Sequence, residues 1–223
     1  MNYSIDQRTS FARARSRLIT GVAGVIALLG AASPALAHHP LGGRAPADLF
    51  EGVVSGFAHP IIGLDHFAFL LAIGLLAVGQ QRRYWIPAAF VVATVAGTTV
   101  HLMGMNLFRV EAMVALSVVL SGALLVAYRH YRPSLLIALS GIAGLFHGYA
   151  YGEAIVGAEN TPLFAYLVGI SVIQYVIMAT TIWAGGRVVH AVSEQASQTL
   201  VRVTGSAISA IGLAFLALTF GAV

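Results

Sequence analysis

The residues of this sequence best suited to chemistry are two histidines and an aspartate inside an apolar stretch. His59, Asp65 and His66 fall within eight residues, and an uncharged run follows them. Ionisable side chains are costly inside a bilayer and usually serve a function there. Imidazole suits nickel, cobalt, zinc and copper, whereas carboxylate favours harder ions. The cluster predicts a divalent-metal site, with a proton relay and a structural hydrogen-bond network as alternatives.

A second group of candidate ligands follows about eighty residues later. His147 and Tyr151 are four residues apart and share a helix face, and Glu153 stands just after them. His101, near the end of another apolar segment, is a candidate ligand or gate. Glu51, eight residues before His59, could guide cations inward. Packing and ordinary hydrogen bonding are the alternative interpretation of these side chains. The candidate metal ligands within the apolar part are therefore His59, Asp65, His66, His101, His147 and Glu153.

Composition places these residues in a membrane. Of 223 residues, 58% are hydrophobic and 9% are charged, against about 25% charged residues in a soluble domain. The chain has no cysteine, which excludes disulfides, iron–sulfur clusters and thiol nucleophiles. No basic patch interleaved with aromatic residues appears, so we expect the lipid bilayer as a partner and no nucleic acid.

The first 37 residues have the pattern of a secretory signal peptide. A positive stretch at 13–17 precedes an apolar stretch at 18–30, and Ala35-Leu36-Ala37 forms a cleavage site. Cleavage would leave His38 and His39 at a new N-terminus, where an amine beside two imidazoles could bind a divalent metal. The alternatives are an uncleaved anchor and two histidines that only follow the cleavage site.

Six apolar segments follow, each close to the roughly 20 residues that cross a bilayer. They lie at 52–79, 85–104, 111–128, 134–151, 163–185 and 203–222. The first contains Gly56, Pro60 and Gly63, which predict a tilted or broken helix. The polar segment 185–202 is expected to be a cytoplasmic loop, partly helical along the surface. We predict an all-α membrane protein with a signal peptide at 1–37, a periplasmic segment at 38–51 and a six-helix transmembrane domain at 52–223.

The arginines predict the orientation of these helices. With a periplasmic mature N-terminus, six arginines fall in cytoplasmic loops and two in periplasmic segments, which obeys the positive-inside rule. The six are Arg82, Arg83, Arg129, Arg132, Arg187 and Arg202, and the two are Arg44 and Arg109. We therefore expect a multi-pass protein of the bacterial inner membrane.

A weak internal repeat links the two groups of candidate ligands. Gly56-Phe57-Ala58-His59 is similar to Gly144-Leu145-Phe146-His147. If the first three spans correspond to the last three, the halves have inverted topology, a recurring plan among transporters. The repeat favours a 3+3 inverted arrangement, although chance similarity is the alternative.

These strings resemble a known family. His59-Pro60-x-x-Gly63-x-Asp65-His66 is similar to the first signature of the HupE/UreJ family of nickel/cobalt permeases, and Phe146-His147-Gly148-x-Ala150 to the second. The resemblance covers essentially the whole chain. It implies a secondary permease that supplies Ni²⁺ or Co²⁺ to hydrogenase, urease or cobalamin systems. The second signature usually continues with His-Gly, where this chain has Tyr151-Gly152.

The candidate ligands, the membrane composition and the family resemblance are compatible with three functions. The first is a permease or channel through which Ni²⁺ or Co²⁺ passes as cargo, with no tightly bound cofactor and no enzymatic activity. The second is an accessory subunit that donates metal to a partner or holds haem between His101 and His147. The third is an intramembrane metalloenzyme. The chain has no Walker A string, so nothing in it indicates ATP use. Assembly into a homo-oligomer is a further expectation.

Overall fold

The computed structural model describes residues 44–221, and all regular secondary structure in that part is helical. The expected signal peptide, His38 and His39 lie outside the described residues. Five helices are long and apolar enough to cross a membrane. They are α5 (Trp85–Leu102), α6 (Val110–Ala127), α7 (Pro133–Gly152), α8 (Asn160–Ala191) and α9 (Glu194–Gly221). The chain thus has the helices of a multi-pass membrane protein, as predicted.

The first apolar segment forms two helices rather than one. α3 (Leu49–Ile62) and α4 (Leu64–Ala77) meet at 77° and pass the length and hydropathy criteria for a span only together. The break falls at Gly63, whose N–H still donates to the carbonyl of His59 at 3.0 Å. A Cβ at Gly63 would lie 2.7 Å from Cδ2 of His66, so glycine is needed for space. The prediction of a broken helix is confirmed.

α8 and α9 are longer than predicted. The segment 185–202, expected to be a polar loop, is mostly helix: α8 continues to Ala191, α9 begins at Glu194, and only two residues connect them. α8 continues through Gly185, which packs against Leu75 of α4 and against Val78 just after that helix. The Ser193 hydroxyl accepts the Ala196 N–H at 3.3 Å and helps to start α9.

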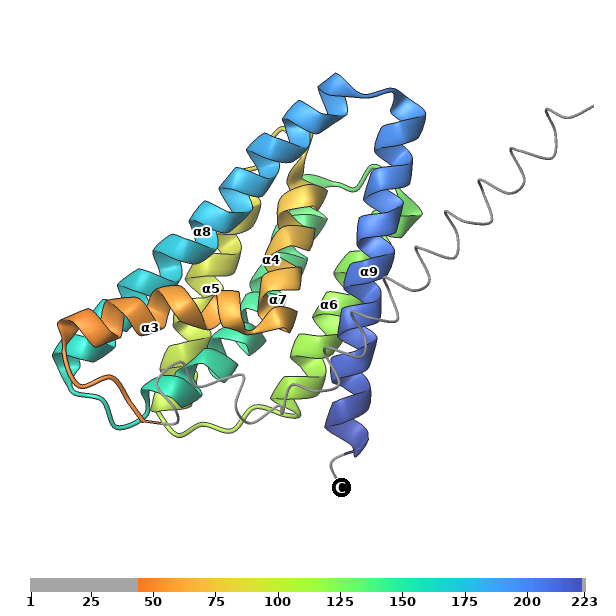
Figure 1. The fold of residues 1–223 in the computed structure, drawn as a ribbon. Helices are drawn as coiled ribbons and strands as arrows, with labels where there is room; N and C mark the ends of the chain where they lie inside the picture. The colour runs from red at the N-terminus through yellow and green to blue at the C-terminus, as the bar shows by residue number, and fades with distance from the viewer. Residues whose placement is uncertain (1–43, 222–223) are drawn as a thin grey trace, which may run out of the picture. The chain divides into compact units, whose positions relative to one another are not determined.

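The connections between helices alternate between two ends (Figure 1). The segments 78–84, 128–132 and 192–193 lie at one end, and 103–109 and 156–159 lie at the other. Arg82, Arg83, Arg129 and Arg132 all stand in the first set, which we call the arginine-rich end. This alternation is what consecutive crossings of one bilayer require.

Small residues allow three pairs of helices to come close. The most extensive contacts join α5 with α7, α6 with α9, and α3 with α8. Between α5 and α7, a Cβ at Gly148 would lie 2.0 Å from the Thr94 carbonyl oxygen, and one at Gly97 2.0 Å from the Leu145 carbonyl oxygen. Close approach of this kind stabilises helix pairs in lipid, where the hydrophobic effect does not.

α4 lies among the other helices and positions the candidate site. Ten of its fourteen residues are buried, and it contacts α6, α8 and α9 (Figure 1). A helix that is apolar on all sides is stable only when it is surrounded. Its first turn carries Asp65 and His66, so these two candidate ligands lie inside the bundle, directly after the break from α3.

Candidate functional site

Two buried histidines from different helices contact each other at the centre of the site. Nδ1 of His66, in the first turn of α4, lies 2.8 Å from Nδ1 of His147, in α7. Their side chains are 1% and 0% exposed. The structure therefore brings together the two signature strings that the sequence separates by about eighty residues.

Ser117 of α6 fixes the orientation of the His147 ring. The Ser117 hydroxyl lies 2.9 Å from Nε2 of His147 and donates its own proton to the Val114 carbonyl at 2.6 Å. The hydroxyl has only one proton, so it must accept the N–H of His147 Nε2. In a neutral ring, Nδ1 of His147 is then the basic nitrogen, and the proton between the two histidines belongs to His66.

This arrangement is the one in which protein histidines hold metals. A ligating imidazole commonly donates its other N–H to a nearby oxygen, which fixes the tautomer and the ring plane. Two imidazole nitrogens on one metal, each at about 2.0–2.1 Å, lie about 3 Å apart. The nitrogens of His66 and His147 already have this spacing. The proton between them lies near the line that joins them, so both rings would have to turn before their lone pairs could point at one cation.

Tyr166 of α8 orients the third histidine. Its hydroxyl donates to the Tyr151 carbonyl at 3.0 Å and lies 3.0 Å from Nδ1 of His59. Since the single hydroxyl proton goes to Tyr151, His59 must donate its Nδ1–H to Tyr166. The basic nitrogen of a neutral His59 ring is then Nε2. His59 is 1% exposed, and Tyr166 is fully buried.

Tyr151 stands between the histidines. Its ring centroid lies 4.4 Å from that of His66, 5.0 Å from that of His59 and 6.4 Å from that of His147. The rings of His59 and His66 are 6.0 Å apart. The three histidines therefore surround a phenol at the position where the resemblance leads one to expect another imidazole.

The Asp65 side chain forms a hydrogen bond with the backbone. It is 5% exposed, and its Oδ1 accepts the N–H of His66 at 2.8 Å. A carboxylate in the first turn of α4 also complements the positive end of the helix dipole. Asp65 thus places a negative charge beside His66 while it stabilises the start of the helix.

Within residues 44–221, no three His, Asp or Glu side chains converge closely enough to hold one metal ion. The histidine pair therefore offers two candidate ligands, of which His66 would first have to free its Nδ1 from the shared proton. A third would require His59 or Asp65 to move toward it.

Comparison with known proteins gives the family. Residues 26–215 match the sequence profile described as "HupE / UreJ protein". This chain belongs to the HupE/UreJ family. Protein HupE of Rhizobium leguminosarum bv. viciae is 32% identical to it over 189 residues, which cover 83% of this chain and 92% of that protein. No solved structure matches the chain at a significant level. The family predicted from the sequence is confirmed.

Two further candidate ligands of this HupE/UreJ member lie apart from the histidine pair. His101, at the end of α5, contacts Tyr149 edge to face with ring centroids 4.5 Å apart and packs on Gly152. Glu153 is exposed just after α7. Both nitrogens of His147 are engaged by His66 and Ser117, so a haem iron, like any metal ion, would have to displace the contact with His66.

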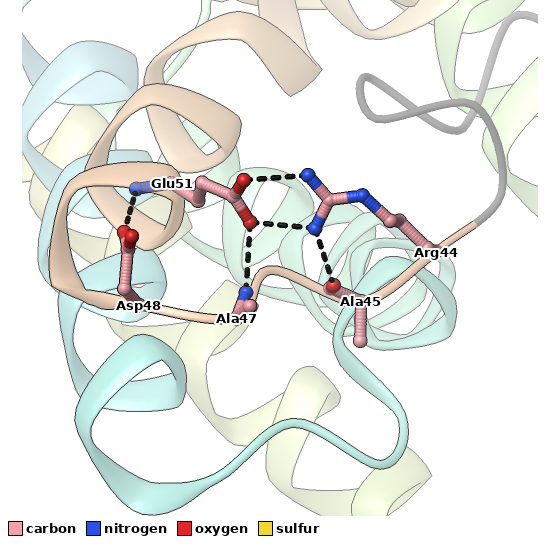
Figure 2. A network of polar contacts seen from close by, with 5 residues as sticks. All are labelled: Arg44, Ala45, Ala47, Asp48 and Glu51. Atoms are coloured by element: carbon pink, nitrogen blue, oxygen red, sulfur yellow. Dashed lines mark hydrogen bonds and ion pairs between the residues drawn. The ribbon is translucent and has the colours of Figure 1, made fainter.

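Glu51 is paired rather than open to a passing cation. The Arg44 guanidinium donates to both Glu51 oxygens at 2.6 and 2.5 Å, and the Ala47 N–H donates to the same carboxylate at 2.9 Å (Figure 2). Hydrogen bonding to Glu51 raises the pKa of the Arg44 guanidinium. Asp48 caps α3 by accepting the Glu51 N–H at 2.8 Å. This network fixes the start of the helix that carries His59.

Sequence reasoning missed Ser117 and Tyr166. Both are hydroxyl residues in apolar helices, and each holds a histidine that the sequence did identify. The available signal was weak, because hydroxyl side chains occur at many other positions of the same helices and satisfy backbone carbonyls there.

Proposed function

We propose that this member of the HupE/UreJ family carries a divalent transition metal, Ni²⁺ or Co²⁺, across the bacterial inner membrane as a secondary permease or facilitated-diffusion channel. The observation that carries the proposal is the buried His66–His147 pair, with His147 oriented by Ser117. Histidines held in this way inside a membrane protein are costly to bury and suited to a passing transition metal.

Binding would require a change in the tautomer or the protonation of His66. His147 already offers the lone pair of Nδ1, and His66 would offer its own once its proton moves to the other ring nitrogen or leaves. Asp65 would offset part of the added positive charge. An inward-negative membrane potential would favour the movement of a divalent ion by about 4.6 kcal/mol per 100 mV.

The orientation of the chain belongs to the same proposal. Signal-peptide cleavage would place His38 and His39 in the periplasm, where they would capture the ion, and the arginine-rich end would face the cytoplasm. The chain would deliver metal to a hydrogenase or urease maturation system and would have no enzymatic activity of its own.

The helix pairs support an inverted repeat. Number the spans so that α3 with α4 is the first and α5 to α9 are the second to sixth. In an inverted repeat the first three spans correspond to the last three. The contact between spans two and four then has its counterpart in the contact between spans five and one, and the contact between spans three and six is its own counterpart. The most extensive contacts, α5–α7, α3–α8 and α6–α9, are these pairs. His59 and His147 would then occupy related positions on either side of the site.

Metal uptake by cells tests the proposal. His147→Ala and His66→Ala, each made in full-length protein with membrane levels matched to wild type, should reduce uptake of radioactive nickel or cobalt to that of cells without the protein. His190→Ala is the matched control, because His190 is exposed near the end of α8, and it should transport normally. Wild-type uptake by both site variants would refute the assignment. Competition among nickel, cobalt, zinc and copper would identify the cargo.

A further inference from the structure

A large apolar crevice lies at the arginine-rich end, away from the histidines. It has a volume of about 830 Å³ and is lined by α4, α6, α8, α9 and the adjoining connections. α8 and α9 diverge from their short connection at this end (Figure 1). The walls are formed mainly by aliphatic side chains, among them Leu76, Leu125, Val188, Leu200 and Val201. The volume is within the range of about 300–1,000 Å³ found for sites that bind small molecules.

The charged lining of this crevice comes from one connection, while Thr180, Thr181 and Thr204 add hydroxyl groups along its walls. Arg129 and His130 line it and are exposed, and both come from the connection between α6 and α7. Ser197, in the first turns of α9, also lines it, is 2% exposed, and its hydroxyl has no hydrogen-bond partner among the described residues. No acidic side chain lines the crevice within residues 44–221. The crevice therefore carries the positive charge of Arg129 and contains a buried hydroxyl without a partner among the described residues.

The backbone turns sharply to place the two basic residues. Tyr128 ends α6 with φ 46 and ψ 50, in the left-handed region. A residue with a side chain adopts this conformation at a cost of roughly 1–2 kcal/mol. The turn takes the chain out of the helix and gives Arg129 and His130 access to the crevice.

We propose that the crevice binds an anionic diacyl phospholipid. Its acyl chains would lie between α4, α8 and α9, its phosphate would meet Arg129 and His130, and the Ser197 hydroxyl would donate to a polar oxygen near the glycerol. A lipid has one charged end and an apolar remainder, as the crevice requires. An apolar helix of a second copy would cover the walls and leave Arg129 and Ser197 without partners. A passing metal cation would be repelled by Arg129.

Lipid-dependent stability of the purified full-length protein tests the proposal. Added phosphatidylglycerol should raise the Tm of detergent-solubilised protein more than phosphatidylcholine does, and soluble glycerol phosphate should have no effect. The double variant Arg129→Ala/His130→Ala should bind phosphatidylglycerol about fivefold more weakly for each full charge removed, since a basic residue near anionic lipid contributes ~1 kcal/mol and 1.4 kcal/mol is tenfold. Arg132→Ala is the matched control, because Arg132 stands exposed in the same connection and does not line the crevice.

A second variant separates shape from charge. Ala184→Phe places a large side chain in the crevice from α8, so it should reduce phosphatidylglycerol binding although both basic residues remain. Equal stabilisation by the two lipids, unchanged binding in the double variant, or cross-linking of two copies through Val188 and Leu200 would each overturn the proposal. Metal uptake is measured separately, so the failure of this inference leaves the proposed transport function untouched.

Discussion

Replacing Gly148 with alanine should push α5 and α7 apart beside His147. The new Cβ would lie 2.0 Å from the Thr94 carbonyl oxygen, 1.4 Å inside the 3.4 Å at which ordinary contact begins. Its two next neighbours, at 2.5 and 2.6 Å, are also backbone atoms of Thr94. Backbone cannot rotate away as a flexible side chain can, so the helices themselves must separate.

The expected cost follows from overpacking. Inserting a methyl group into a tightly packed interior costs about 1–3 kcal/mol, while replacing glycine by alanine in a helix returns up to ~1 kcal/mol. Gly141→Ala is a matched control in the same helix, because a Cβ at Gly141 meets nothing within 4 Å. The propensity gain is common to both variants, so Gly148→Ala should be less stable than Gly141→Ala by about 1–3 kcal/mol.

Reversible unfolding of the purified protein in mixed detergent would measure this difference, and metal uptake would report its effect on the site. Separation of α5 and α7 should also move His147 relative to His66 and lower uptake, whereas Gly141→Ala should transport normally. Equal stability of the two variants would refute the close packing of α5 and α7 described here.

Two further predictions concern the hydroxyl groups that orient the histidines. Ser117→Ala should lower the apparent affinity for metal in uptake assays by about 10–100-fold, because His147 loses the oxygen that fixes its tautomer; Ser117→Thr should restore it, and unchanged affinity in Ser117→Ala would refute the role. Tyr166→Phe should lower the free energy of unfolding by about 1–3 kcal/mol, because the His59 N–H and the Tyr151 carbonyl lose a buried partner. Tyr175→Phe, at a partly exposed position of α8, should cost much less, and equal losses would contradict the hydrogen bonds assigned to Tyr166.

The fold was predictable to the extent that hydropathy determines it. Apolar length located the membrane-crossing segments, and Pro60 with Gly63 indicated the break that the structure shows between α3 and α4. The extent of α8 and α9 was not predictable in the same way. Both helices continue through the polar sequence 185–202. Hydropathy identifies the apolar part of a helix and does not show where its polar ends stop.

The sequence predicted which residues form the candidate site better than it predicted how they are arranged. His59, Asp65, His66 and His147 stood out because ionisable side chains are rare in apolar segments. The contact between His66 and His147 depends on how α4 and α7 are rotated about their axes, which a single sequence does not specify.

Glu51 shows that a side chain identified from the sequence can have a partner that the sequence does not reveal. A role in guiding cations inward was one of the alternatives for Glu51, but Arg44, which precedes the helix, forms an ion pair with its carboxylate. Helical periodicity within α3 could not have revealed a partner from outside the helix.

The break at Gly63 divides the candidate ligands between two helices. His59 belongs to α3, whereas His66 belongs to α4. A rotation about this joint would change the distance between His59 and His66 and leave the contact between His66 and His147 intact. The coordination of a bound ion could therefore be altered by displacing the fourteen residues of α3 along their contact with α8, while α4 and α7 keep their places.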